Sequence, residues 1–214
     1  MAIHPNESKA NRHCLVLGKS GSGKTYWLKH QPLLKRRGVR LLVWDPYESH
    51  DCAYFRDRRQ FARHVALAVK SGRGFRLGLS VHPDPEAFEW FCRIAWAALD
   101  GRRDTVIMVE ELGDVSKPGK AGQNWGQLVR VGRKYGAILL AVSQRPQEID
   151  KTLFTQVARV WCGLVSSYDQ AYCERHIGLP RGALGQIKPG SYEFVLSDGH
   201  SHKWGGPKKR KITL

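Results

Sequence analysis

The chain has 214 residues, a formal net charge of +16 and a pI near 9.9. This length fits one large α/β domain with a sizeable hydrophobic core and excludes two independent domains. Lys and Arg outnumber Asp and Glu by 35 to 19. This excess indicates a polyanionic partner, nucleic acid ahead of a membrane surface, with a merely basic soluble protein as the alternative.

The first predicted unit is a strand, a glycine-rich turn and a helix. The apolar run at residues 13–18 fits a buried strand, and residues 25–32 fit the start of a helix. Between them stands a complete phosphate-binding loop of the form GxxxxGK(S/T), which consists of Gly18, Lys19, Ser20, Gly21, Ser22, Gly23, Lys24 and Thr25.

This loop predicts a nucleoside triphosphate site, with a chance glycine turn as the alternative. Its glycines let backbone N–H groups surround phosphate oxygens without a Cβ in the way, and the helix N-terminus adds partial positive charge. The Lys24 ammonium would reach the β- and γ-phosphates, and the Thr25 hydroxyl would ligate Mg²⁺.

Strands and helices alternate along the rest of the chain. Asp84 is expected to cap a helix that has Pro85 at its first position. The alternation predicts an α/β fold with a mostly parallel sheet that helices cover on both faces. Strands are predicted at residues 39–45, 74–81, 105–111, 136–144, 158–165 and 191–196, and helices at 55–69, 85–99 and around 125–134.

Polar side chains stand at the ends of two further predicted strands. Ligands bind beyond the carboxyl ends of strands in such sheets, so Glu110, Glu111 and Gln144 are expected near the phosphate loop. Glu110 would hold Mg²⁺ through a water, Glu111 would polarise the attacking water, and Gln144 would sense the γ-phosphate. The alternatives are a solvated Glu-Glu turn and an amide that only satisfies backbone groups. Asp45, at another strand end, is expected to belong to the site, with the cap of a turn as the alternative.

An arginine supplied by a neighbouring subunit would stabilise charge in the transition state of hydrolysis. Arg133 and Arg130 are the candidates for this finger, and Arg145 and Arg159 are weaker ones. For each of them, an ordinary surface arginine is an equally good interpretation.

The chain ends are expected to lie outside the folded domain. The boundaries predicted are an N-terminal segment at 1–12, an ATPase domain at 13–199 and a basic C-terminal tail at 200–214. The tail is expected to be flexible and to contact phosphate backbones, a nuclear import signal being the alternative. We interpret the HxH pair, His200 and His202, as part of this solvated tail.

Cysteine usage and hydropathy bear on the compartment. The five scattered cysteines form no CxxC pair, which favours reduced thiols in a cytosol-like compartment. No signal region is apparent, and no apolar run approaches the ~18 residues of a membrane span. We therefore expect a soluble protein.

Three segments together carry a resemblance to a known family. GKSGSGKT, VIMVEE and GRKYGAILLAVSQRPQEIDKTLFTQVARV resemble the FtsK/HerA superfamily of DNA-pumping ATPases, over about residues 14–165. The GRKYG…SQRP stretch is the discriminating part. Within the superfamily the chain is similar to genome-packaging ATPases of tailless icosahedral viruses with an internal membrane, the tectivirus-like group. FtsK itself and conjugative coupling proteins add membrane spans and larger domains.

The resemblance implies a RecA-like domain of the additional-strand, catalytic-glutamate class. It implies a homo-oligomeric ring, a hexamer or pentamer, with double-stranded DNA in its centre and ATP with Mg²⁺ at the subunit interfaces. It assigns Lys24 and Thr25 to nucleotide and metal, Glu111 to water activation and Gln144 to γ-phosphate sensing. Arg133 becomes the preferred finger, with Arg130 next. Glu110 departs from the family pattern, which has Asp at this position.

The leading hypothesis is an ATP-driven double-stranded DNA translocase that packages a viral genome into a preformed capsid. Such a protein would act in the host cytoplasm or at the packaging vertex of the virion, beside capsid vertex proteins. A motor for filamentous phage assembly or conjugative DNA transfer is an alternative. Alternatives of another class are a small-molecule kinase and a nucleotide-gated DNA-binding protein.

Overall fold

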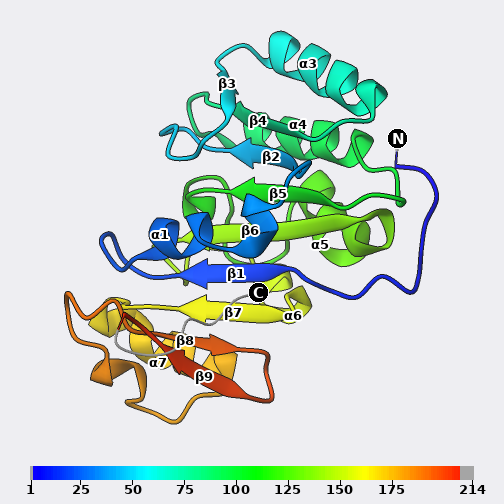
Figure 1. Cartoon of the computed structure of the whole chain (residues 1–214). Helices are drawn as coiled ribbons and strands as arrows, with labels where there is room; N and C mark the ends of the chain where they lie inside the picture. Colours follow the sequence, from blue (N-terminus) through cyan, green and yellow to red (C-terminus); the bar gives the residue numbers. More distant parts are fainter. Residues whose placement is uncertain (1, 208–214) are drawn as a thin grey trace.

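One mixed sheet organises the molecule, in a computed structural model that describes residues 2–207 (Figure 1). Within these residues nine strands are arranged in the order β3-β4-β2-β5-β6-β1-β7-β8-β9. The strands from β3 to β7 run parallel, and β8 and β9 are antiparallel to their neighbours. The strands are β1 (Cys14–Leu17), β2 (Arg40–Trp44), β3 (Ala53–Phe55), β4 (Phe75–Leu79), β5 (Thr105–Val109), β6 (Ala137–Ser143), β7 (Arg159–Cys162), β8 (Phe194–Ser197) and β9 (His202–Gly205).

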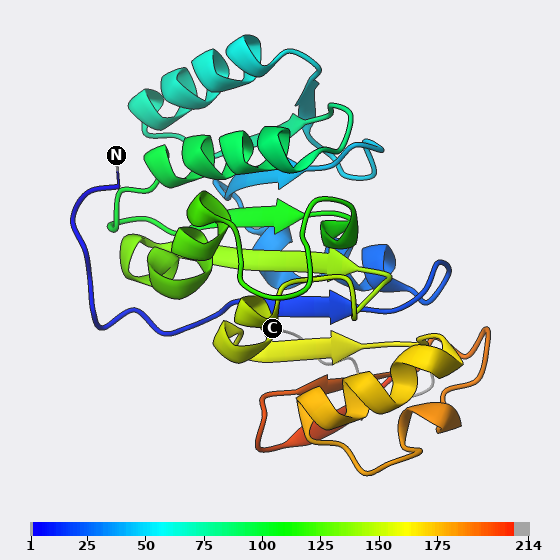
Figure 2. The same cartoon turned by 180° about the vertical axis from the view of Figure 1, so that it is seen from behind.

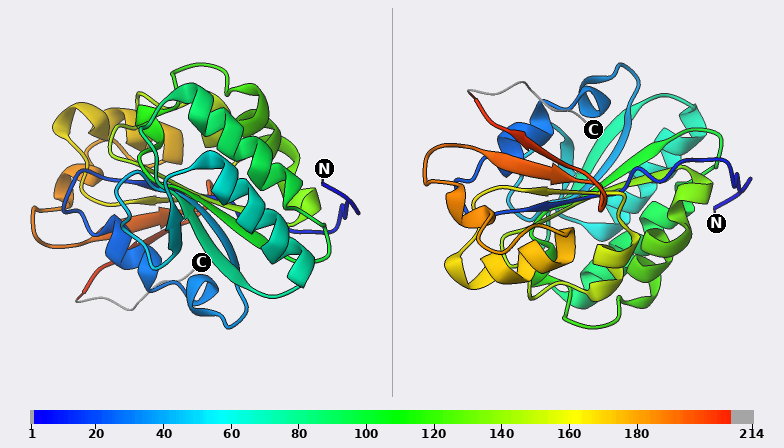
Figure 3. Two further views of the ribbon diagram at one scale, coloured as in Figure 1. Left: turned by 90° about the horizontal axis from the view of Figure 1, so that it is seen from above. Right: turned by 90° about the horizontal axis from the view of Figure 1, so that it is seen from below.

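The helices divide unequally between the two faces of the sheet (Figures 2 and 3). Side chains of α3 to α7 pack into one core cluster, and those of α1 and α2 pack into a second, smaller cluster on the other face. The helices are α1 (Lys24–Lys29), α2 (Pro32–Lys35), α3 (Arg58–Ser71), α4 (Pro85–Ala97), α5 (Gln123–Val131), α6 (Lys151–Gln156) and α7 (Ser167–Ile177), with 3-10 turns η1 (Leu112–Asp114), η2 (Gly132–Tyr135) and η3 (Leu184–Gln186).

This architecture confirms the predicted fold class. The strand β6 lies between the phosphate-loop strand β1 and the strand β5 that precedes the acidic pair, which is the additional-strand arrangement. The central strands are fully buried, as expected for a sheet with helices on both faces. The predicted cap is also present, because the Asp84 carboxylate accepts a hydrogen bond from the Ala87 N–H at 2.8 Å.

The expectation of a flexible tail from residue 200 onward is wrong for its first residues. The strand β9 pairs with β8 through a turn in which the Asp198 carboxylate accepts hydrogen bonds from the N–H groups of His200 and Ser201. These bonds lower the pKa of Asp198 to about 2. His202 is no solvated side chain, since its Nε2 lies 2.8 Å from the carbonyl oxygen of Ile177. The remaining part of the predicted tail, 208–214, lies outside the described residues.

The N-terminal segment lies along the amino ends of the strands. Arg133, in η2, donates hydrogen bonds to the carbonyls of Glu7 and Lys9, and the Lys9 ammonium pairs with Asp104 at 2.7 Å.

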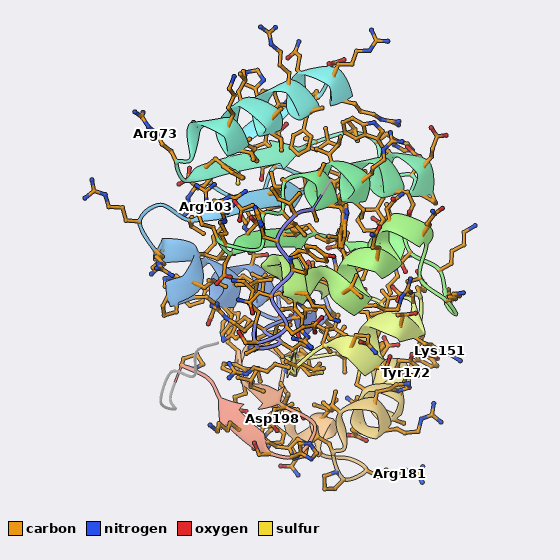
Figure 4. All side chains as sticks on the ribbon, turned by 90° about the vertical axis from the view of Figure 1, so that its right-hand side faces the viewer. Arg73, Arg103, Lys151, Tyr172, Arg181 and Asp198 are labelled. Carbon is orange, nitrogen blue, oxygen red and sulfur yellow. The ribbon has the colours of Figure 1, made fainter. Side chains whose placement is uncertain are left out.

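In the described part of the chain no helix is long and apolar enough to span a membrane. Charged side chains, Arg73 and Arg181 among them, stand out from the ribbon around the molecule (Figure 4).

Candidate nucleotide site

One cavity of about 330 Å³ opens at the carboxyl ends of the central parallel strands. The register of the sheet brings the predicted groups to it: Val109 of β5 pairs with Ala141 of β6, and Ser143 of β6 pairs with Leu17 of β1. The loops that follow these three strands therefore start side by side. The cavity is lined by Ser20, Gly21, Ser22, Gly23, Lys24, Thr25, Tyr26, Tyr47, Ser49, Glu110, Glu111, Gln144 and Tyr192.

The phosphate loop is closed by contacts that need its glycines. Gly23 has φ +94, a left-handed conformation that a residue with a Cβ adopts at a cost. At Gly18 a Cβ would lie 2.5 Å from the Ser22 hydroxyl oxygen, so the loop can close only around glycine. The Gly18 N–H donates to the Ser143 carbonyl at 3.3 Å, which ties the loop to the strand that carries Gln144.

Lys24 lies inside the loop rather than on its surface. Its ammonium donates to the carbonyl oxygens of Gly18 at 2.7 Å and Lys19 at 3.1 Å. Burial lowers the pKa of Lys24, while the nearby carboxylates of Glu111 and Glu110 act in the opposite direction. Gly18 and Lys19 thus contribute backbone to the site, and the other loop residues line the cavity.

The two carboxylates of the acidic pair are held by different partners. Glu110 is 5% exposed, and its Oε1 lies 2.5 Å from Nε2 of His50. Glu111 has φ +49, which is unusual for a residue with a side chain. This backbone conformation points the Glu111 side chain in a different direction from that of Glu110. Its Oε1 accepts a hydrogen bond from Nε2 of Gln144 at 2.5 Å.

The environment of Glu111 shifts the pKa of its carboxyl group upward. Burial raises its pKa, and the charges of Glu110 and Asp114 raise it further, whereas the Gln144 hydrogen bond and the Lys24 charge lower it. A carboxylate with a raised pKa next to a phosphate loop is suited to accept a proton from water.

Asp45 is not part of the cavity lining, which corrects the expectation that it belongs to the site. It is fully buried, and its carboxylate accepts hydrogen bonds from the N–H groups of Tyr47 and Ser49 and from the hydroxyl of Tyr54. Asp45 therefore organises the loop after β2, from which Tyr47 and Ser49 reach the cavity.

The oxygen donors fit a magnesium ion bound together with phosphates. Thr25 and Glu110 line the same cavity and offer a hydroxyl and a carboxylate. Among the described residues no group of three or more His, Cys, Asp or Glu side chains could hold a metal by itself. Mg²⁺ commonly takes only one or two protein oxygens and completes its shell with phosphate and water, so this donor set suits it.

A second, aromatic cavity of about 480 Å³ adjoins the first. Both cavities share Ser22, Gly23, Tyr26 and Tyr192 in their linings. The second cavity is otherwise walled by Trp27, His30, Gln31, Trp161, Phe194, Gly206 and Pro207. Flat apolar walls beside a phosphate loop have the shape and chemistry to take a nucleobase.

The candidate arginine fingers do not lie at this cavity. Arg133 lies at the amino ends of the strands, at the opposite edge of the sheet, where it donates to backbone carbonyls of the N-terminal segment. Arg130 is exposed near the end of α5. Arg145 follows Gln144 on the cavity side and pairs with Glu148. A role for Arg133 or Arg130 therefore requires the site of another subunit.

Sequence reasoning missed His50, Tyr47, Ser49 and Tyr192. The first three lie in the polar loop after the strand predicted at 39–45, whose carboxyl end faces the same edge as the phosphate loop. This position is the signal that could have found them. Tyr192 has φ +52, and its ring lies close to Gly23. A Cβ added to Gly23 would lie 3.3 Å from that ring. No local pattern marks that approach.

Comparison with known proteins gives one similar sequence and several similar folds. Protein P9 of Pseudoalteromonas phage PM2 is 43% identical over 158 residues, which are 73% of this chain and 70% of that protein. No protein-family model matches the sequence. Among solved structures, the genome packaging NTPase B204 from Sulfolobus turreted icosahedral virus 2, in complex with sulfate, has a TM-score of 0.71 at 16% identity and covers 95% of this chain and 98% of its own. VirB4 of Thermoanaerobacter pseudethanolicus has a TM-score of 0.62 at 13% identity and covers 95% of this chain and 90% of its own.

The similarities in structure establish the fold, and the identity to protein P9 establishes the family. The phosphate loop, the acidic pair and Gln144 line one cavity, as their places at the ends of predicted strands led us to expect. The chain therefore belongs to the family of protein P9 of phage PM2.

Proposed function

We propose that this protein hydrolyses ATP and uses the energy to move double-stranded DNA into a viral capsid. The observation that carries the proposal is the meeting of Lys24, Glu111 and Gln144 in one cavity at the carboxyl ends of β1, β5 and β6. In support, B204 of Sulfolobus turreted icosahedral virus 2 has been solved in complex with AMPPCP and with ATP-gammaS, and B204 of Sulfolobus turreted icosahedral virus is described as a DNA-packaging ATPase.

Each residue of the cavity has its own role in the proposed hydrolysis. The loop N–H groups and the Lys24 ammonium bind the phosphates. Thr25 and Glu110 would hold Mg²⁺, which when bound neutralises phosphate charge. Glu111 orients the attacking water and takes its proton, and Gln144 fixes the Glu111 carboxylate through the 2.5 Å hydrogen bond. The same amide can contact the γ-phosphate side of the cavity, because it belongs to the lining.

The nucleoside is assigned to the aromatic cavity. Tyr26 and Tyr192, which line both cavities, are 66% and 54% exposed, and the buried residues Trp161 and Phe194 also line the aromatic cavity. A purine ring between such walls would exclude water from apolar surface and stack on aromatic faces.

The charge and the family support the polymer and the assembly that we propose. A net charge of +16 provides for contacts with phosphate backbones that do not depend on sequence. We propose a ring of five or six copies, with Arg133, or Arg130 next, reaching the cavity of the neighbouring copy. The protein would act in the host cytoplasm or at the packaging vertex of the virion, where capsid vertex proteins are its partners.

A DNA-stimulated ATPase assay, combined with a mass measurement of the assembly, tests this function. We expect phosphate release that rises on addition of double-stranded DNA, from a multimer. Glu111→Gln should reduce hydrolysis by about 100-fold or more, the usual contribution of a general base, while ATP binding persists. Hydrolysis indifferent to DNA in a chain that stays monomeric at high concentration would refute the motor. Unchanged turnover in the Glu111→Gln variant would refute the catalytic assignment.

A further inference from the structure

The loop after β2 lies beside Glu110 because of the sheet register. The strands β2 and β5 are neighbours, and Trp44 pairs with Val109 at their carboxyl ends. The N–H of Glu110 donates to the Trp44 carbonyl at 2.9 Å, which continues the ladder by one residue. Residues 45–52 therefore leave the sheet next to the first carboxylate of the acidic pair.

This loop is held by a buried network. The Asp45 carboxylate accepts from the Ser49 N–H at 2.5 Å and from the Tyr54 hydroxyl at 2.6 Å, and the Tyr54 oxygen accepts from the His50 N–H at 3.0 Å. The backbone of His50 is thus tied to a side chain of β3. A Cβ on Gly78 of β4 would lie 2.4 Å from the Tyr54 ring, so Tyr54 packs closely against the glycine of the neighbouring strand.

The network places the His50 ring against the Glu110 carboxylate. The His50 Nε2 lies 2.5 Å from Glu110 Oε1, and the two side chains are 4% and 7% exposed. A carboxylate is an acceptor only, so Nε2 carries the proton and donates it in this bond. Glu110 is one of the described residues that line the cavity, and His50 is not. His50 would therefore act on a ligand only through Glu110.

We propose that His50 is a positioning residue that holds Glu110 in place for the Mg²⁺ of bound Mg·ATP. A glutamate has one more rotatable bond than the aspartate usual at this position, and that freedom would weaken a metal ligand. The bond from His50 to Oε1 removes the freedom and leaves the second oxygen for the metal side. The proposal rests on the proposed function, since it assumes that the cavity binds Mg·ATP.

Binding of a non-hydrolysable ATP analogue, with Mg²⁺ and with EDTA, tests this role without hydrolysis. In the wild-type protein Mg²⁺ should raise the affinity for the analogue. In His50→Ala this gain should shrink by about 10-fold or more, as for other residues that orient metal ligands, while the affinity in EDTA stays the same. His50→Gln, which keeps an amide donor, should recover part of the gain. His82→Ala, at an exposed histidine, is the matched control and should bind like wild type.

A double-mutant cycle separates positioning from general support of the fold. If His50 acts through Glu110, His50→Ala should change nothing further in a Glu110→Ala background. Equal losses with Mg²⁺ and with EDTA, or a full Mg²⁺ gain in His50→Ala, would overturn the inference. Wild-type protein that gains no affinity from Mg²⁺, or does not bind the analogue at all, would instead refute the proposed function itself. Tyr54→Phe, which removes the oxygen that receives the His50 N–H, provides a second variant if His50→Ala does not fold.

Discussion

At the scale of single residues, the site depends on two glutamates that are adjacent in sequence but separately held. Glu110 meets His50, and Glu111 meets Gln144. The left-handed backbone of Glu111 makes this division possible, because it turns the second side chain out of the alternation of an extended strand. Strain of this kind is tolerated where function requires it.

The Gln144 hydrogen bond leads to a prediction about pH. The bond lowers the pKa of Glu111, while burial raises it above the ordinary value. A general base works only when deprotonated, so the turnover number should fall as the pH drops through this raised pKa. Gln144→Ala removes the stabilising donor and should move the acidic limb of the profile to higher pH, in addition to lowering the rate. The profile of turnover number against pH measures this shift, and a limb that stays in place or moves to lower pH would contradict it.

His13 leads to a prediction about acid stability. It is 1% exposed, its Nδ1 accepts from the Leu139 N–H at 3.1 Å, and burial together with the Arg133 charge lowers its pKa from 6.5 to about 4. A histidine with a depressed pKa in the folded state stabilises the fold above pH 6.5 and loses that contribution as the pH falls towards 4. By pH 5 the loss should reach about 2 kcal/mol.

Urea unfolding of wild type and His13→Asn at pH 7 and pH 5 measures this loss. The asparagine keeps an acceptor for Leu139 but does not titrate, so the variant should lose less stability between the two pH values. Parallel losses in both proteins would show that other groups cause the acid sensitivity. Arg133→Ala should reduce the loss in the wild-type background, because a positive charge near His13 is removed.

At the scale of elements, the sequence predicted what local patterns determine. The strand β1, the phosphate loop and the start of α1 follow from an apolar run and eight consecutive residues. The ends of β5 and β6 follow from buried runs that close on Glu110 and Gln144. Each of these features lies within a window of about ten residues, so the pattern and the structure report the same local chemistry.

Other elements depend on contacts between distant segments, and the sequence did not predict them. The strand β3 has only three residues, and its Tyr54 is held by Asp45, which follows β2, and by Gly78 of β4. The helix α7 buries a charged residue, Glu174, and this weakens the apolar pattern of the helix. The Glu174 carboxylate accepts hydrogen bonds from the N–H groups of Gly182 and Leu184. The His50–Glu110 contact joins residues sixty positions apart. No local period encodes such pairs.

The packing of β3 on β4 leads to a prediction at this scale. Gly78→Ala places a methyl group 2.4 Å from the Tyr54 ring and forces β3 or the ring to move. Overpacking of this kind should lower the free energy of unfolding by about 1–3 kcal/mol. Gly185→Ala is the matched control, because its Cβ would make only an ordinary contact with Gln170 at 3.5 Å. Equal unfolding midpoints for the two variants in urea would contradict the packing argument.

At the scale of the whole molecule, the excess of basic residues determines how the proposed DNA contact should behave. Each phosphate that a Lys or Arg neutralises releases counterions, so the affinity for DNA should fall linearly on a log–log plot against salt. For six to ten phosphates the loss should be roughly 10³–10⁵ between 50 and 200 mM salt.

Equilibrium binding to two duplexes of equal length and unrelated sequence provides the measurement. We expect the same affinity and the same salt slope for both, since backbone contacts carry no sequence information. A strong preference for one duplex, or an affinity insensitive to salt, would show that groups other than surface cations carry the binding. The nucleotide state should be fixed with a non-hydrolysable analogue during the titration.

The unequal helix cover of the sheet has a consequence for the relation between ligand and fold. Within residues 2–207, five helices pack on one face, and only the short α1 and α2 pack on the other. On that second face Trp27, Trp161 and Phe194 belong both to the small core cluster and to the aromatic cavity. A nucleoside in that cavity would take the place that a further helix holds in a more evenly covered sheet. Nucleotide would then be an interior component of the protein, and at one hundred times its dissociation constant it would add about 2.7 kcal/mol to stability. A subunit that has released its nucleotide would be a subunit with an incomplete core.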